Sequence, residues 1–151
     1  MDAKKKDGRY GRIVKQLESL LTATENLESR MATIVAVLHH KMDYFFWTGF
    51  YCLDGGVLTV RNYQGPVACQ VLKKDTGVCW AVINQKETMV VPDVHKFPGH
   101  IACDSRSNSE IVVPIKNTSG EIFGVLDVDS KEINSFDEVD AMWLEKIVSL
   151  I

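Results

Sequence analysis

Residues 90–110 read VVPDVHKFPGHIACDSRSNSE, and the interpretation of the whole chain starts from them. Between an expected strand that ends at Val91 and Glu110 lie two prolines, two histidines, a cysteine and an arginine: Pro92, Pro98, His95, His100, Cys103 and Arg106. The prolines and the absence of a hydrophobic period exclude a regular helix or strand here. Compact domains rarely contain so long a loop unless it binds or catalyses, so we expect function here rather than a plain surface crossover.

The composition predicts one globular domain. With 151 residues, 46% of them hydrophobic and 25% charged, we expect a single domain over residues 1–151, of which residues 1–8 are disordered. A net charge of −3 offers nucleic acid no basic surface. The first lysines are not followed by an apolar run, which excludes a signal peptide, and no stretch is apolar enough to span a membrane. We therefore expect a cytoplasmic protein, whose four cysteines act in catalysis, bind metal or are simply buried.

Hydrophobic periodicity predicts an α+β fold. Apolar residues at helical spacing indicate one helix from Tyr10 to Leu21 and a second, capped by Thr24, that reaches Leu38. A terminal helix should begin with a capping box formed by Ser135 and Glu138. A short helix is expected at residues 78–86, and strands at residues 47–53, 57–63, 67–72, 89–91, 110–116 and 121–129. Strands in hairpins, with helices gathered on a sheet face, make an α+β domain.

The last strand carries two acids that require an explanation. Its two alternating faces are both largely apolar, so we expect a central strand that is covered on both sides, in part by a second subunit. Asp127 and Asp129 share one face, and a loop at residues 117–120 would place Glu110 opposite Asp127 and diagonal to Asp129. Three acids this close imply a bound cation, a shared proton, or open solvent at that end of the sheet.

The four cysteines differ in their expected surroundings. Cys79 falls in the first turn of the short helix, where the helix dipole favours its ionisation, and Cys103 has His100 nearby. Cys69 lies in the third strand, and Cys52 alternates with aromatic residues, which is typical of a core position. A buried, inert thiol remains the alternative for Cys69 and Cys79.

A zinc site is the other use of these residue types. The ligands would be two histidines and two cysteines: His95, His100, Cys103 and Cys79. However, the sequence has no Cys-x-x-Cys pair, and the spacing matches none of the usual zinc patterns. We therefore expect no metal.

Several motifs together resemble those of the free methionine-R-sulfoxide reductases, a catalytic branch of the GAF domains. They are the loop VVPDVHKFPGHIACDSRSNSEIVVPI, GVLDVDS, SFDEVDAMWLE, WTGFY, QGPVAC and GVCW. All three family cysteines fall on cysteines of this chain, at Cys69, Cys79 and Cys103. The resemblance implies a single GAF domain, with a central antiparallel sheet flanked by the N- and C-terminal helices, and usually a homodimer.

The resemblance also implies a reaction. A cofactor-free enzyme would reduce free methionine-R-sulfoxide to methionine and be recycled by thioredoxin. Cys103 would attack the sulfoxide sulfur and become a sulfenic acid, and Cys69 would resolve it to a disulfide. Cys79 is the alternative partner in that disulfide.

The candidate substrate-binding residues fit this chemistry. Glu110, Asp127 and Asp129 would hold the substrate ammonium, and Asp129 or Glu110 would protonate the sulfoxide oxygen. Trp47 and Tyr51 share a strand face and would pack around the S-methyl group, unless they belong to an ordinary aromatic core. Two other functions stay open: a non-catalytic GAF module that senses a small ligand, and a thiol-based redox sensor or peroxidase that uses Cys103 alone.

Overall fold

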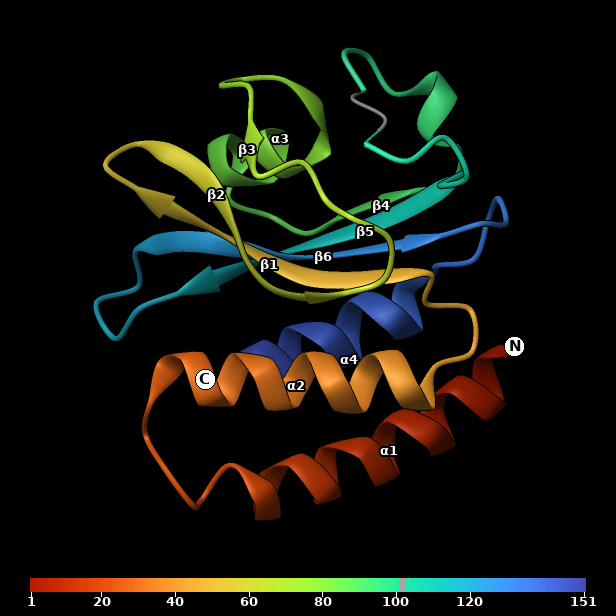
Figure 1. Ribbon diagram of the computed structural model, residues 1–151. Coiled ribbons are helices and arrows are strands. Elements are labelled where there is room, and N and C mark those ends of the chain that lie inside the picture. Colours follow the sequence, from red (N-terminus) through yellow and green to blue (C-terminus); the bar gives the residue numbers. More distant parts are fainter. Residues whose placement is uncertain (101–102) are drawn as a thin grey trace.

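The computed structural model describes residues 1–100 and 103–151, and within them six strands form one sheet with the order β3-β2-β1-β6-β5-β4 (Figure 1). The helices are α1 (Ala3–Leu20), α2 (Leu27–Lys41), α3 (Gly77–Gln85) and α4 (Glu138–Val148). The strands are β1 (Trp47–Asp54), β2 (Val57–Gln64), β3 (Val71–Leu72), β4 (Met89–Val91), β5 (Ser109–Lys116) and β6 (Ile122–Ser130). All neighbouring strands are antiparallel, so the predicted α+β class is confirmed.

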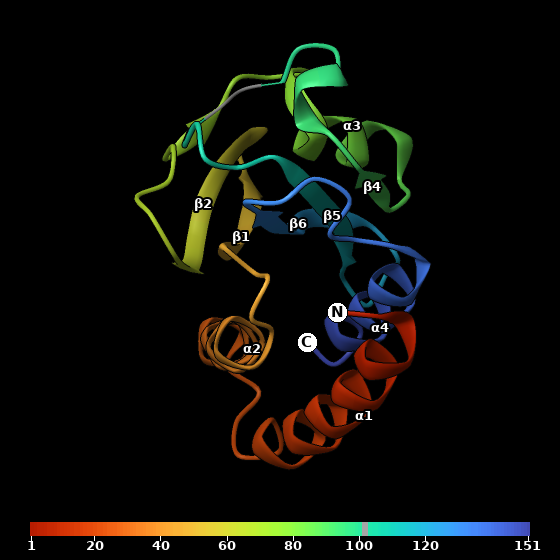
Figure 2. The same cartoon turned by 90° about the vertical axis from the view of Figure 1, so that its right-hand side faces the viewer.

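The two faces of the sheet belong to two separate apolar cores. On one face α2 packs against β1 and β2, α4 packs against β4 and β5, and α1 lies across α2 and α4 (Figure 2). On the other face α3 packs against β5 and β6. The central strand β6 supplies Leu126 and Val128 to the first core and Val125 to the second, as its two apolar alternations predicted. Cys52 is a buried free thiol of the first core, also as predicted.

The N-terminus differs from its prediction. Residues 1–8 are not disordered, because α1 begins at Ala3 and the Asp2 side chain caps it by accepting a hydrogen bond from the Lys5 amide. The Lys6 side chain is buried, and its ammonium lies 2.6 Å from Asp140 Oδ2. The Tyr10 hydroxyl donates to the other oxygen of Asp140 at 2.7 Å. These partners lie about 130 residues away along the chain, so no local pattern reveals them.

Two helix caps also differ. The side chain that caps α2 belongs to Asn26 and not to Thr24, whose hydroxyl instead accepts from the Asn26 amide. The capping box of α4 is formed by Asp137 and Asp140, two residues later than the predicted pair, and the Ser135 hydroxyl instead bonds to Ser130. In both cases the predicted cap makes another local hydrogen bond, and a second suitable residue two positions later caps the helix.

The third strand is shorter than predicted. Only Val71 and Leu72 of the expected residues 67–72 form strand pairs with β2. The Gln70 carbonyl still accepts a hydrogen bond from the Val60 amide, but Ala68 and Cys69 bond to tyrosine side chains. No helix among the described residues is both long and apolar enough to cross a membrane.

The register of β5 against β6 corrects the predicted pairing of the acids. Glu110 lies opposite Asp129, and Val112 lies opposite Asp127, whereas the sequence predicted Glu110 opposite Asp127. Two changes at the loop end of the hairpin cause the difference: Lys116 pairs with Ile122 rather than with Glu121, and an irregularity between Ile115 and Lys116 shifts the register by one more residue. The register differs by two residues, and side chains alternate with period two, so the three acids still share one face.

Candidate active site

One cavity lies between α3, the central strands and the long loop. The space within it is about 640 Å³ when the part that is open to solvent is counted. Its lining includes seven of the predicted site residues: Trp47, Tyr51, Cys79, Cys103, Glu110, Asp127 and Asp129. The eighth, Cys69, is bonded to Cys103. Residues that are far apart in the sequence are therefore gathered at one site.

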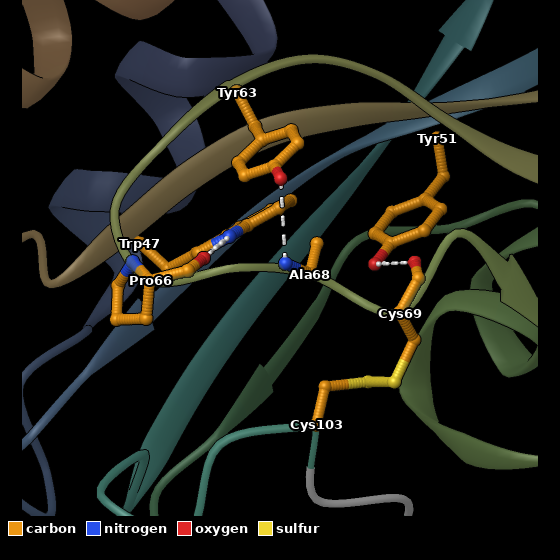
Figure 3. Close-up of a disulfide and its surroundings, with 7 residues drawn as sticks. All are labelled: Trp47, Tyr51, Tyr63, Pro66, Ala68, Cys69 and Cys103. Carbon is orange, nitrogen blue, oxygen red and sulfur yellow. Dashed lines mark hydrogen bonds between the residues drawn. A yellow bond between two sulfur atoms is a disulfide. The ribbon is translucent and has the colours of Figure 1, made fainter.

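A disulfide joins Cys69 to Cys103 at the edge of this cavity (Figure 3). The two residues are 34 positions apart in the chain, and their Cα atoms are 5.6 Å apart. Cys103 is exposed and Cys69 is half-buried, so the bond lies near the surface. Spatially adjacent thiols that form a disulfide in one state can react with a small oxidant in the other.

Three aromatic side chains hold the segment Pro66–Cys69 in place. The Tyr51 hydroxyl donates to the Cys69 carbonyl at 3.0 Å, and the Trp47 indole N–H donates to the Pro66 carbonyl at 3.1 Å. Tyr63 approaches the Ala68 amide at 3.5 Å (Figure 3). Trp47 stacks against both tyrosines, with ring centroids 5.8 and 5.2 Å away. Trp47 and Tyr51 thus line the cavity and also position the strand-like segment that carries Cys69.

Gly49 is a site residue that the sequence interpretation missed. A Cβ atom at this position would lie 2.4 Å from the Tyr63 Cβ and 2.6 Å from the Trp47 ring. Gly49 also stands opposite Asp127 in the sheet, so its close packing against Trp47 and Tyr63 adjoins the acids. The only signal for it was the small residue inside the aromatic run WTGFY, which usually marks a close approach of other groups.

Cys79 lies in the first turn of α3 and is a buried free thiol. Burial raises the pKa of this thiol well above its ordinary value, and the nearby acids Asp127, Glu110 and Asp129 raise it further. The prediction that the helix dipole makes Cys79 easier to ionise is therefore wrong. Desolvation and three like charges outweigh the dipole of a nine-residue helix.

The three acids form one tightly coupled group. Glu110 and Asp127 are each only 6% exposed, and Asp129 is partly exposed. Burial raises the pKa of Glu110 and of Asp129 well above the ordinary value, and the neighbouring Asp127 adds to both shifts. Burial also raises the pKa of Asp127, and the neighbouring Glu110 and Cys79 side chains oppose that rise. The three carboxyls therefore favour bound protons or a cation over full ionisation.

The long loop contributes polar groups of two kinds. Its histidines differ: His100 lines the cavity and burial lowers its pKa, whereas His95 is exposed and its ring nitrogen lies 2.9 Å from Asp93. Arg106 binds Asp104 at the rim and holds the pKa of that carboxyl at about 2.

The four zinc ligands considered from the sequence are not assembled among the described residues, since Cys103 is bonded to sulfur and His95 to Asp93. Residues 101 and 102 of the quoted loop motif lie outside the described residues.

The fold and the site match a defined group of proteins. The GAF domain family model matches residues 17–151. GAF domain-containing protein A of Dictyostelium discoideum is 46% identical over 97% of this chain and 92% of that protein. Free methionine-R-sulfoxide reductase of Saccharomyces cerevisiae is 46% identical over 89% of this chain and 83% of that protein.

A solved structure agrees with these sequence matches. The free methionine-R-sulfoxide reductase of Neisseria meningitidis, in complex with its substrate, superposes with a TM-score of 0.92 at 37% identity, over 99% of this chain and 88% of that chain. The chain therefore belongs to the GAF domain family and, within it, to the family of free methionine-R-sulfoxide reductases.

Proposed function

We propose that this protein reduces free methionine-R-sulfoxide to methionine, with Cys103 as the attacking thiolate. The observation that carries the proposal is the disulfide between Cys69 and Cys103 at the edge of a cavity that also contains three coupled acids. A relative that is 46% identical bears the name of this activity, which further supports the proposal.

The proposed reaction conserves atoms and electrons. The Cys103 thiolate attacks the sulfoxide sulfur while an acid protonates the sulfoxide oxygen, and the oxygen then passes to the cysteine as methionine departs. Cys103 is left as a sulfenic acid. The Cys69 thiol attacks it, water leaves, and the disulfide forms with two electrons transferred from the thiols to the substrate.

Cys69 is the better candidate for the resolving thiol. It is the residue bonded to Cys103, and its segment is held by Tyr51 and Trp47. Cys79 is buried beside the acids, and its raised pKa keeps it protonated and poorly nucleophilic. We therefore assign Cys79 no covalent step.

The acids are proposed to divide two tasks between them. Asp127 and Glu110 lie deepest and would hold the substrate ammonium. Asp129 is partly exposed and has a raised pKa, so it would hold a proton near neutral pH and donate it to the sulfoxide oxygen. Trp47 and Tyr51 present ring faces to the same cavity and would enclose the S-methyl group.

Recycling needs an external dithiol, and we propose thioredoxin in the cytoplasm. Cys103 is exposed, which supports direct attack on its sulfur by an incoming thiolate. The incoming thiolate would form a mixed disulfide with Cys103 and release Cys69, and the second thiol of the dithiol would complete the exchange. The proposal also includes a homodimer, as in the resembling family.

The test uses fully reduced protein without an external reductant. Mixed in equal amounts with free methionine-R-sulfoxide, it should form about one equivalent of methionine per chain, whereas the S epimer should remain unchanged. Addition of thioredoxin should then allow repeated turnover. If neither epimer is consumed while hydrogen peroxide quickly joins Cys69 to Cys103, the protein is a thiol-based redox sensor and the proposal fails.

A further inference from the structure

A buried thiol and two buried carboxylates meet in the wall of the proposed active-site cavity. Cys79 Sγ and one carboxylate oxygen each from Glu110 and Asp127 all lie within 4.8 Å of one another. The three residues come from α3, β5 and β6, which pack directly against each other. The proposed reaction uses the two acids but gives the thiol no chemistry, so its place in this group requires another explanation.

A second observation points to a missing partner at the same place. Among the described residues, Asp127 Oδ1 is a buried oxygen without a hydrogen-bond partner. Burying a polar atom without a partner costs free energy. Native structures therefore rarely retain one unless a bound species supplies the missing hydrogen bond or coordinates the atom. Asp127 also lines the cavity, so a small species that enters the cavity can reach this residue.

The donor set selects the kind of species. Magnesium and calcium prefer six or more oxygen ligands, whereas zinc accepts sulfur and oxygen together in a tetrahedral site. Zinc bonds of about 2.3 Å to sulfur and about 2.1 Å to oxygen place ligand atoms roughly 3.5 Å apart. The observed limit of 4.8 Å lies within a small side-chain rotation of that arrangement.

We propose that Cys79, Glu110 and Asp127 bind one zinc ion in the cavity and that this ion excludes the substrate. The ion would be an inhibitor and not a cofactor, since it would occupy the carboxylates proposed to hold the substrate ammonium. Its fourth position would face the cavity and take a water molecule, as in zinc sites with three protein ligands. Zinc binding itself does not depend on the proposed reaction, so it is measured separately from activity.

The experiment uses protein in which the disulfide between Cys69 and Cys103 is intact, because those two thiols are then unable to bind metal. Calorimetric titration with zinc chloride should show one ion per chain, and magnesium chloride should show none. Cys79→Ser should weaken zinc binding on the order of a hundredfold or more, because it removes the only thiolate ligand. Cys52→Ser is the matched control: Cys52 is also buried and free but belongs to the opposite core, so its zinc affinity should equal that of the parent.

Cobalt(II) supplies an independent spectroscopic readout. The parent and Cys52→Ser should show thiolate-to-cobalt charge-transfer absorption, and Cys79→Ser should not. If Cys79→Ser fails to fold, Asp127→Asn provides the test instead: it keeps the thiol but removes a carboxylate ligand, so it should also lower zinc affinity. The proposal is overturned if no zinc ion binds, or if Cys79→Ser binds it as tightly as the parent, because the metal would then lie on exposed groups such as His95. In the same oxidised protein, added methionine sulfoxide should weaken zinc binding, because the ion and the substrate ammonium would share Glu110 and Asp127. Zinc affinity that is unchanged by methionine sulfoxide would overturn the proposed exclusion of substrate.

Discussion

Glu110 lies directly opposite Asp129 on the adjacent strands β5 and β6, and both side chains line one cavity. Like charges in opposed positions of a sheet are destabilising, and burial adds to the cost of ionising either group. Burial is the largest cause of the raised pKa of both carboxyls; Asp127 raises both further, and Asp129 adds to the rise at Glu110. The pair is retained at a cost in stability, which is typical of a functional site.

This relationship predicts how stability depends on pH. A carboxyl with a folded-state pKa above its unfolded value, about 4, contributes stability below that value and loses it as pH rises through the folded pKa. Asp129→Asn removes one such group while keeping its shape. Without substrate, the free energy of unfolding of the parent should therefore decline more between pH 4 and pH 8 than that of the variant.

Chemical denaturation at several pH values measures the difference. Taking the difference between parent and variant cancels the contribution of groups such as Asp93, whose pKa is lowered by its hydrogen bond with His95 and whose effect on stability has the opposite sign. Equal pH dependence in the two proteins would mean that Asp129 titrates like a solvated carboxyl.

Replacing each cysteine of the disulfide should block a different step of the proposed reaction. Cys103→Ser should form no methionine even when enzyme and substrate are mixed in equal amounts, because the attacking thiol is absent. Cys69→Ser should form about one equivalent and then stop, because its sulfenic acid has no resolving partner. Dimedone should trap that sulfenic acid on Cys103, which mass spectrometry detects. Full thioredoxin-driven recycling by Cys69→Ser would instead assign the resolving role to Cys79.

The fold could be predicted in outline because its signals are local. Alternation and turn residues placed the strands of both hairpins, and the apolar faces of β6 identified it as central. The register of β5 against β6 was wrong by two residues, because an irregularity beside Lys116 depends on contacts that no alternation encodes. The prediction that the acids share one face is still correct, because a register shift of two residues leaves every side chain on the same face of the sheet.

Three other features could not be predicted from local sequence, because each depends on residues that are distant in the chain. The pairing of Cys69 with Cys103 came from the family resemblance, since spacing alone does not determine a disulfide. The ion pair between Lys6 and Asp140 joins the two ends of the chain, so the local sequence of residues 1–8 predicts disorder and not the helix that forms. The raised pKa of Cys79 depends on the acids of two other strands.

The ion pair of Lys6 with Asp140 should be essential for stability. Asp140 is fully buried and binds the Lys6 ammonium as well as the hydroxyls of Tyr10 and Tyr44. Lys6→Met leaves a buried carboxylate without its cation, which should cost about 3–5 kcal/mol in the free energy of unfolding. Lys5→Met, at an exposed neighbouring position, should change stability by less than about 0.5 kcal/mol. Urea unfolding of both variants tests the difference, and a small effect of Lys6→Met would show that water reaches Asp140.

Gly49→Ala should damage the site through packing. The added Cβ would lie 2.4 Å from the Tyr63 Cβ, so one of the two strands must move. Overpacking of this kind costs about 1–3 kcal/mol, and it should also displace Trp47, slowing disulfide formation after the first turnover. Gly11→Ala is the control, because its Cβ would meet no atom closer than 3.9 Å and should leave stability unchanged or slightly raised. Thermal unfolding and the rate of disulfide formation report the two effects. Parent-like values for Gly49→Ala would rule out the tight packing of Trp47 against Tyr63.

The acids should also make the enzyme selective for a free amino acid. Methionine sulfoxide inside a peptide has no ammonium, so Glu110 and Asp127 would keep their burial without gaining a cation. Leaving buried charged groups unpaired costs several kcal/mol, and kcat/KM for a peptide sulfoxide should therefore be lower by roughly a thousandfold or more. Asp127→Asn should greatly lower kcat/KM for the free amino acid but hardly change the low kcat/KM for the peptide sulfoxide. The ratio of the two kcat/KM values should therefore be smaller in the variant than in the parent. Measuring both substrates with both proteins separates charge recognition from simple exclusion by size. If Asp127→Asn lowers both activities equally, the cavity rejects peptides by shape, and the substrate ammonium is bound elsewhere.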